Sequence, residues 1–144
     1  MKISERFVKR QDEWLSENNI PHAGLCIGFS WELANEINKH KEGVASVYHF
    51  WDTHAAVLVG DHVIDPTAKQ YDRGIKGLFY RDRQEYLYWL SGQLFMRGTF
   101  AMYHSWKQLT IAGKIRTYGR DINPNLAMHM VLQRYRNETM SALR

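Results

Sequence analysis

The chain has 144 residues, of which 44% are hydrophobic and 24% are charged, and its formal net charge is +4. This composition is typical of one folded globular domain and excludes a disordered or fibrous chain. At this length a core can form without disulfides or a structural metal. The lysines and arginines are spread thinly, with no basic stripe, helix-turn-helix or zinc-finger spacing, so the positive charge predicts a solvated face and not a nucleic-acid surface.

Cys26 is the only cysteine, so the chain cannot form an internal disulfide. No apolar run approaches the roughly 18 residues of a membrane span, and acidic Glu5 and Asp12 interrupt the N-terminal segment. We therefore expect a reducing cytoplasmic location, with no cofactor and no metal. A lone cysteine is most often a small buried apolar residue, so its position in the chain decides how it is interpreted.

Two helices are expected first. Apolar residues recur near helical spacing from Ser4, a candidate N-cap, to Asn18, and the segment from Pro21 to Gly24 then breaks the helix. The segment from Leu25 to about His40 has an apolar face wide enough for a buried central helix. Gly28 within it indicates that another backbone passes close by.

Three antiparallel strands are expected next. Val44 to Trp51 is rich in β-branched and aromatic residues, and His54 to Val59 is a short apolar run. Gly60-Asp61 has the composition of a two-residue hairpin turn. The third strand, His62 to Asp65, ends at Pro66, which cannot continue a ladder.

The second half of the chain has a less regular pattern. Arg81 to Phe95 predicts a helix with a broad apolar face, and Thr99 to Ile111 is compatible with helix or strand. A last helix is expected with Asn123 as N-cap and Pro124 at its first position. Its apolar face is expected to include Leu126, Met130 and Leu143.

Cys26 lies where a nucleophilic thiol would be activated. A free thiol has a pKa near 8.5 and is mostly protonated at neutral pH, whereas the reactive species is the thiolate. Cys26 opens the apolar helix, where unpaired backbone N–H groups and the positive end of the helix dipole stabilise negative charge. The same N–H groups can help to form an oxyanion hole.

The hairpin supplies a base and an orienting carboxylate. If Gly60 and Asp61 form the turn, Ala56 faces Asp65, and alternation puts His54 on the same side of the sheet as Ala56. His54 and Asp65 are then diagonal neighbours at roughly 7 to 8 Å between Cα atoms, within side-chain reach. His62 falls on the opposite face. A carboxylate on one imidazole nitrogen leaves the other nitrogen to take the thiol proton.

The order of these motifs resembles a known enzyme class. Gly24-Leu25-Cys26 opening a helix, His54-Ala55-Ala56-Val57 on a strand, and Asp65-Pro66-Thr67 ending the next strand resemble the transglutaminase-like branch of papain-like enzymes. The resemblance covers about residues 20–72. The family often has Trp where Ala56 stands, and a small apolar residue where Ser30 stands.

This resemblance implies an α+β fold in which a buried helix carrying Cys26 packs on a small antiparallel sheet carrying His54 and Asp65. It implies one domain over 1–144, with a catalytic core at about 20–72 and a helical part at about 79–144. Cys26, His54 and Asp65 would be the catalytic triad, with Asn19 or His22 as a polar oxyanion donor. The reaction would be acyl transfer or amide hydrolysis on a protein or peptide substrate.

Other interpretations of the same residues stay open. The chain could be an inactive papain-like binding module that interacts with a protein partner. It could hold a metal through Cys26, His54, His62 and Asp65, or through His49, Asp52 and His54, although no HExxH or CxxC spacing occurs. A small nucleic-acid-binding protein is a third alternative. The residues do not determine whether water, an amine or another acceptor would resolve a thioester.

Overall fold

The computed structural model describes residues 2–50, 54–96, 114–115 and 126–141. The helices are α1 (Ile3–Glu17), α2 (Cys26–Lys39), the short η1 (Ala68–Gln70), α3 (Arg83–Met96) and α5 (Leu126–Ser141), and the strands are β1 (Ala45–Phe50), β2 (His54–Val59), β3 (His62–Ile64), β4 (Tyr80–Asp82) and β5 (Lys114–Ile115). The fold is therefore α+β, as expected.

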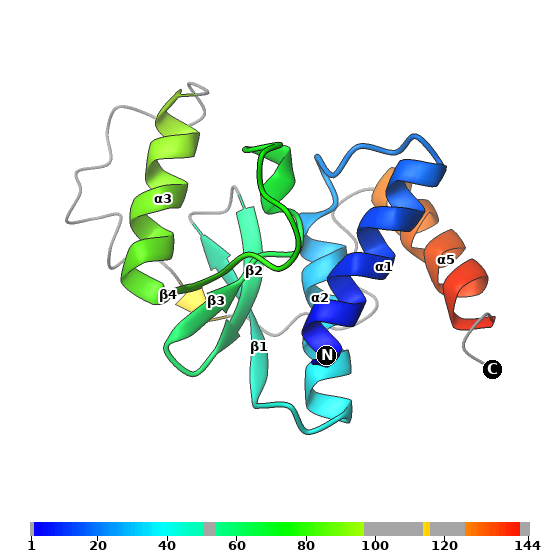
Figure 1. The fold of residues 1–144 in the computed structure, drawn as a ribbon, viewed down its shortest axis with the longest axis horizontal. Coiled ribbons are helices and arrows are strands. Elements are labelled where there is room, and N and C mark those ends of the chain that lie inside the picture. Colours follow the sequence, from blue (N-terminus) through cyan, green and yellow to red (C-terminus); the bar gives the residue numbers. More distant parts are fainter. Residues whose placement is uncertain (1, 51–53, 97–113, 116–125, 142–144) are drawn as a thin grey trace.

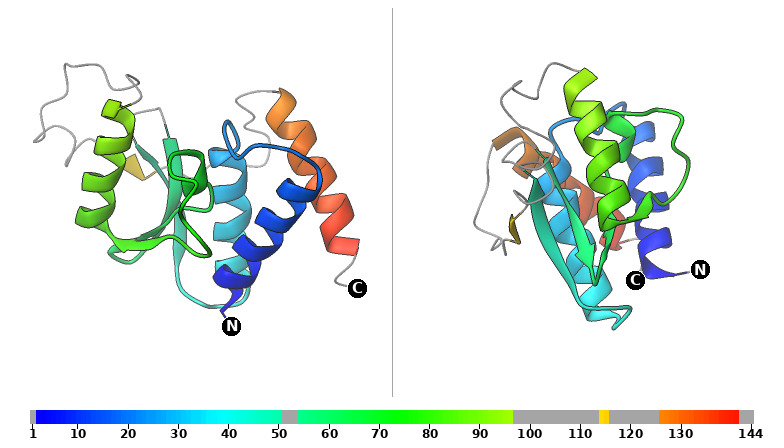
Figure 2. Two further views of the ribbon diagram at one scale, coloured as in Figure 1. Left: turned by 45° about the horizontal axis from the view of Figure 1, so that its top comes forward. Right: turned by 90° about the vertical axis from the view of Figure 1, so that its left-hand side faces the viewer.

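The helices and the sheet form layers. Helix α3 covers one face of the sheet, α2 covers the other face, and α1 and α5 pack on the outer side of α2 (Figures 1 and 2). A helix with a wide apolar face must bury it on several sides, and α2 does so between β1, β2 and its two helical neighbours. Among the described helices, none is long and apolar enough to cross a membrane.

The sheet is antiparallel, with strand order β4-β3-β2-β1-β5. The predicted hairpin register is confirmed, because Val59 pairs with His62 and Leu58 pairs with Val63. Gly60 has φ +60°, the left-handed conformation that a tight hairpin turn requires and glycine adopts without strain. The turn therefore sets which side chains of β2 and β3 share a face.

Strand β4 corrects the predicted start of the third long helix. Arg81 pairs with Val63 across the β3 edge, so Arg81 and Asp82 belong to the sheet and α3 begins at Arg83. The Asp82 carboxylate accepts a hydrogen bond from the Glu85 N–H at 2.8 Å, which is N-capping geometry. The strand pairing is long-range, so the local helical pattern did not reveal it.

Two apolar cores lie on the two faces of the sheet. The core on the α2 side is formed by residues including Phe7, Leu15, Phe29, Leu33, Ile37, Val47, Val57 and Ile64. The core on the α3 side is formed by residues including Tyr48, Phe50, Ala56, Leu58, Val63, Phe79, Tyr86, Leu87 and Leu90. Alternate residues of β2 contribute to opposite cores, as the pleat requires.

Two details of the helices differ from the predictions. Ser4 lies inside α1 and does not cap it, because the helix already begins at Ile3 and the Ser4 N–H donates to Glu42 Oε2 at 3.1 Å. The close neighbour of Gly28 is the Leu132 side chain of α5, not another backbone. A Cβ at position 28 would overlap Leu132 Cδ1.

Helix α5 presents a different face from the predicted one. Leu132 and Tyr135 are buried, whereas Met130 is 60% exposed and does not belong to the core. Polar contacts also attach the helix, since Trp14 Nε1 donates to Glu138 Oε2 at 2.5 Å. The predictions for Thr99–Ile111, Asn123, Pro124 and Leu143, and for the Leu126 side chain, lie outside the described residues.

Candidate active site

Helix α2 begins at Cys26, as predicted. Gly24 has φ +82°, which turns the chain into the helix, and the first helical hydrogen bond runs from Phe29 N–H to Leu25 O at 3.1 Å. The amides of residues 26–28 therefore precede the hydrogen-bonded ladder, and the Leu25 cap position contributes no side-chain hydrogen bond. These amides and the helix dipole favour an anion at the Cys26 sulfur.

The first turn of α2 lies against the start of β2. Buried Ser30 donates a hydrogen bond from Oγ to the Ala55 carbonyl oxygen at 3.2 Å. Partly buried Cys26 lies beside the Ala55 backbone and the His54 side chain, both of which lower the pKa of its thiol. The beginning of the helix and the beginning of the strand are thus level with each other, although about 30 residues separate them in the sequence.

His54 and Asp65 form a buried pair. His54 Nε2 lies 2.8 Å from Asp65 Oδ2, and both side chains are fully inaccessible to solvent. Two ionisable groups removed from water are costly to bury, so they persist only where each has partners. The sequence predicted this proximity from the hairpin register alone.

The Asp65 carboxylate is held by several donors. The Tyr86 hydroxyl of α3 donates to Oδ2 at 2.6 Å, while the Thr67 N–H donates to Oδ1 at 3.0 Å and the Thr67 hydroxyl lies 3.4 Å from the same oxygen. Tyr86 is 0% exposed. The carboxylate therefore has a fixed orientation toward His54.

The second nitrogen of His54, Nδ1, faces two polar side chains. The Tyr71 hydroxyl lies 3.2 Å from Nδ1, and the Gln70 amide nitrogen lies 3.5 Å from it. The Tyr71 ring packs edge-on against the imidazole, with centroids 5.1 Å apart. Since Asp65 occupies Nε2, Nδ1 is the nitrogen available to exchange a proton with Cys26.

The ionisation of these groups follows from their contacts. Burial alone would raise the pKa of Cys26, but the hydrogen bond and charge of His54, together with the Ala55 backbone, outweigh it and lower that pKa from 9.0. Burial alone would lower the pKa of His54, but the charge and hydrogen bond of Asp65, aided by Cys26, raise it to about 10. Both shifts favour a thiolate and an imidazolium.

The two predicted oxyanion donors lie on the loop before α2. Asn19 is exposed with φ +56° and follows the C-cap of α1, where asparagine tolerates the left-handed conformation. His22 Nε2 lies 2.7 Å from Asp12 Oδ1, so its ring is bound to helix α1. An oxyanion role for either side chain stays a prediction.

His62 is separate from the Cys26 site. Its ring stacks on Tyr80 with centroids 4.8 Å apart, and it shares a sheet face with Ile64, which packs in the α2-side core. Among the described residues, no group of three or more His, Cys, Asp or Glu side chains is arranged to hold a metal ion. Asp52, named in the second metal alternative, lies outside the described residues.

Three residues around Cys26, His54 and Asp65 were not predicted from the sequence: Gln70, Tyr71 and Tyr86. Tyr86 was interpreted only as part of an apolar helix face, and its hydroxyl contact with Asp65 depends on how α3 packs on the sheet. Gln70 and Tyr71 follow the Asp65-Pro66-Thr67 motif by a few residues, and no local pattern marks them. Thr67 did belong to the motif that was recognised.

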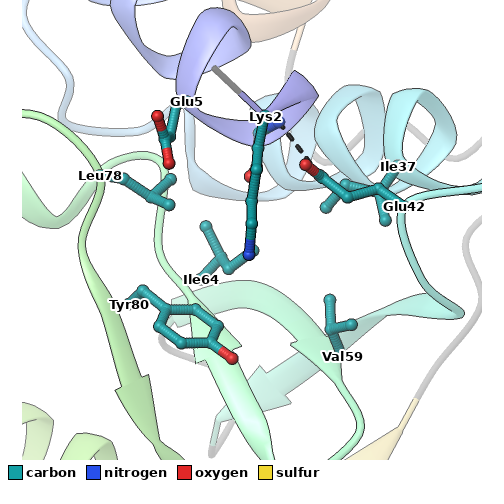
Figure 3. Close-up of a pocket in the computed structure, with 9 residues that line it drawn as sticks. Lys2, Glu5, Ile37, Glu42, Val59, Ile64, Leu78 and Tyr80 are labelled. Atoms are coloured by element: carbon teal, nitrogen blue, oxygen red, sulfur yellow. Dashed lines mark hydrogen bonds between the residues drawn. The ribbon is translucent and has the colours of Figure 1, made fainter. Parts of the chain in front are cut away.

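The molecule has a cavity at each end of the α2–β2 pair. One, of about 210 Å³, is lined by Ile37 and Val59 at the far ends of these elements, with the Lys2 side chain extending into it (Figure 3). The other, of about 490 Å³, is lined by residues that include Gln70 and also Ala23, three positions before Cys26. The second cavity lies near His54, because the Gln70 amide nitrogen is 3.5 Å from His54 Nδ1.

Comparisons with known protein families, with curated proteins and with solved structures found no match. The functional conclusion therefore rests on the chemistry of the residues described above.

Proposed function

We propose that this protein is an enzyme of cysteine-dependent acyl transfer or amide hydrolysis, acting through a thioester on Cys26. One observation carries the proposal: a thiol at a helix start lies beside a buried histidine whose Nε2 lies 2.8 Å from a buried carboxylate oxygen. A nucleophile, a base and a group that orients the base are what such chemistry needs.

In the acylation step, the Cys26 thiolate attacks the carbonyl carbon of an amide. A C–S bond forms, and the carbonyl π electrons move to oxygen, where the free amides at the start of α2 stabilise the charge. Protonated His54 then gives its Nδ1 proton to the leaving nitrogen as the C–N bond breaks. The products are an amine and an acyl-thioester on Cys26.

In the second step, neutral His54 takes a proton from water or an amine, which attacks the thioester carbonyl. The C–S bond breaks and the acyl group leaves as an acid or a new amide, with the thiolate and imidazolium restored. Asp65 stays ionised and holds the imidazole in the tautomer that leaves Nδ1 free. The hydroxyl of Tyr86 and the backbone of Thr67 hold Asp65 in turn.

We further propose that the core is of the papain-like, transglutaminase-like type. The order of Cys on a helix, His on a strand and Asp ending the next strand supports this assignment. Ser30 stands where the family usually has a small apolar residue. The hydrogen bond from its hydroxyl to the Ala55 carbonyl oxygen explains why serine fits this position. A protein or peptide amide would be the substrate class.

The proposal is tested by the pH dependence of Cys26 alkylation with iodoacetamide. We expect a rate near pH 6 at least about tenfold above that of a model thiol with pKa 8.5, and an ordinary thiol profile in His54→Ala. Intact mass spectrometry after exposure to p-nitrophenyl acetate should detect a transient acetyl group on Cys26. An ordinary alkylation profile in the wild-type protein would favour the inactive binding module.

A further inference from the structure

A cavity with cationic side chains in its lining lies near His54. It has a volume of about 490 Å³ and is lined by Pro21, His22, Ala23, Lys69, Gln70 and Arg73. These residues come from the loop that leads into α2 and from the segment that follows β3, two stretches that lie side by side (Figures 1 and 2). The cavity is thus built by two segments far apart in the sequence.

The cavity reaches the reactive groups from both walls. On one wall, Gln70 lines the cavity and also places its amide nitrogen 3.5 Å from His54 Nδ1. On the other wall, Ala23 lines it three residues before Cys26. A molecule in this space would therefore contact Gln70, which lies against His54, and the loop that leads into Cys26.

The charged residues that line the cavity are of one sign. Lys69 and Arg73 are cations, and no carboxylate is among the lining residues. Asp12 does not line the cavity, but its carboxylate pairs with the Lys69 and His22 side chains that do. Arg73 is exposed and forms no ion pair with a residue that the structure describes. Counting Lys69, Arg73 and Asp12, the cavity has a net charge of +1 when His22 is neutral.

The neighbouring acidic residue does not neutralise Arg73. The Asp72 carboxylate accepts a hydrogen bond from the Gly74 N–H at 2.9 Å, within its own loop, and Asp72 does not line the cavity. A guanidinium matches a carboxylate through two parallel hydrogen bonds, and it is the side chain best suited to hold one at a partly exposed site. The fork of Arg73 is therefore available to a ligand.

We propose that this cavity binds a carboxylate of the acyl donor, so that the substrate is an acidic peptide or an amide that carries a carboxylate close to the reacting carbonyl. This inference rests on the proposed function, because it names the substrate class of the same thiol. The net charge of +4 on the whole chain adds a favourable long-range field for such an anion.

The experiment compares two alkylating reagents of nearly equal size, anionic iodoacetate and neutral iodoacetamide. In both, the Cys26 sulfur forms a bond to the CH₂ carbon and iodide leaves with the electron pair of the C–I bond. The ratio of the two rate constants, measured at pH 8 and low salt, reports the charge at the approach to the sulfur. An unactivated thiol also reacts at this pH, so the ratio is measurable whether or not Cys26 is activated.

Two exposed cations form a matched pair for mutation: Arg73, which lines the cavity, and Lys76, which does not. We expect Arg73→Gln to lower the iodoacetate to iodoacetamide ratio by about two- to threefold and Arg73→Glu by about five- to tenfold, with the effect reduced in 0.5 M NaCl. Lys76→Gln removes an exposed cation that does not line the cavity, and it should change the ratio by less than about 1.5-fold.

An equal ratio in the wild-type protein and Arg73→Glu would overturn the substrate assignment, while a high alkylation rate near pH 6 would still support the proposed thiol chemistry. A ratio that Lys76→Gln lowers as much as Arg73→Gln would likewise overturn it, since the effect would then come from net charge alone. A change confined to the Arg73 variants would support the cavity as the site for the carboxylate.

Discussion

The two ends of the α2–β2 pair have opposite chemical character. At the starts of these elements, Cys26 and His54 belong to a buried polar network, whereas at their far ends Ile37 and Val59 pack in an aliphatic environment. A helix of 14 residues is roughly 20 Å long, so the two ends are distant enough to respond independently to substitution.

The polar end of the pair is the one that an apolar replacement could stabilise. Apolar residues of similar volume in place of a buried ion pair are often neutral or stabilising, while removing one partner is strongly destabilising. The network of Asp65, His54, Tyr86 and Thr67 therefore contributes little that an apolar packing could not supply. A catalytic role explains the presence of this network better than stability does. Substitutions at the far, apolar end of the pair serve as controls for those in the network.

The largest expected effect is that of Cys26→Ala. Without the sulfur no thioester can form, so turnover of an activated ester should fall by about 10³-fold or more, to the background rate. Mass spectrometry should detect no acyl adduct. The matched change at the far end, Val59→Ala, should leave the rate within about twofold. Full activity in Cys26→Ala would end the thiol hypothesis.

Asp65→Asn should have the next largest effect. The change keeps the size of the side chain but removes the charge that raises the pKa of His54, so the acylation rate should fall on the order of 10²-fold. The midpoint of the Cys26 alkylation profile should move toward that of an ordinary thiol. Glu36→Gln is the control, since Glu36 lies 3.3 Å from His40 in a partly exposed carboxylate and histidine pair near the other end of α2. An unchanged profile in Asp65→Asn would contradict an orienting role.

The pH dependence of stability tests the His54–Asp65 pair. A raised pKa means that protonated His54 stabilises the fold fully below pH 6.5, and that this stabilisation is lost as the pH rises through the folded pKa. The lowered pKa of Cys26 has the opposite sign, since its contribution is present above pH 9.0 and lost as the pH falls through the folded value. The His54 and Cys26 contributions to the unfolding free energy thus change with pH in opposite directions and partly cancel in the wild-type protein.

In a variant without the thiol, the pH dependence of the unfolding free energy that arises from His54 should be measurable by itself. We expect the free energy of unfolding of Cys26→Ala, relative to Cys26→Ala with His54→Gln, to decrease above pH 6.5 by up to about 1.4 kcal/mol per pH unit. Urea unfolding from pH 6 to pH 9 measures this difference. A difference that increases with pH would show that His54 is buried neutral.

Ile37→Ala tests the apolar end. Ile37 is 1% exposed, and truncation of a buried isoleucine costs about 2 to 4 kcal/mol of unfolding free energy. The alkylation rate of Cys26 near pH 6 should not change in the folded protein. A change in thiol reactivity comparable to that of Asp65→Asn would show that the two ends are coupled.

The smallest expected effect is that of Tyr86→Phe. Loss of the 2.6 Å hydrogen bond to Asp65 should cost about 1 to 2 kcal/mol of unfolding free energy and slow acylation several-fold. Tyr135→Phe is the control, because Tyr135 is a buried tyrosine of α5 outside the Asp65 network. Both variants should lose stability, and only Tyr86→Phe should raise the pKa of Cys26. Equal thiol profiles in the two variants would assign Tyr86 a structural role alone.

Features of the chain that depend on neighbouring residues were predictable. The break from Pro21 to Gly24 placed Cys26 at a helix start, and Gly60-Asp61 set the register that brings His54 to Asp65. Glycine conformation and strand alternation are local properties, so they could be derived without a structure.

Features that depend on packing between distant segments could not be predicted from the sequence. Arg81 and Asp82 fit a helical pattern in the sequence, yet in the structure they pair with the edge of β3 and belong to β4. Met130 matched an apolar face, yet α5 docks through Leu132 over Gly28 and leaves Met130 exposed. In both cases a long-range contact outweighs a weak local preference.

By itself, the sequence determined the residue types and the relative order of the reactive groups, because helix starts, hairpin turns and strand alternation are set within a few residues. Packing between distant segments determines that the start of α2 lies against the start of β2, that the Tyr86 hydroxyl reaches Asp65, and that Gln70 and Arg73 line one cavity with the loop before Cys26. These contacts join segments tens of residues apart, and only the packing of helices on both faces of the sheet brings them together.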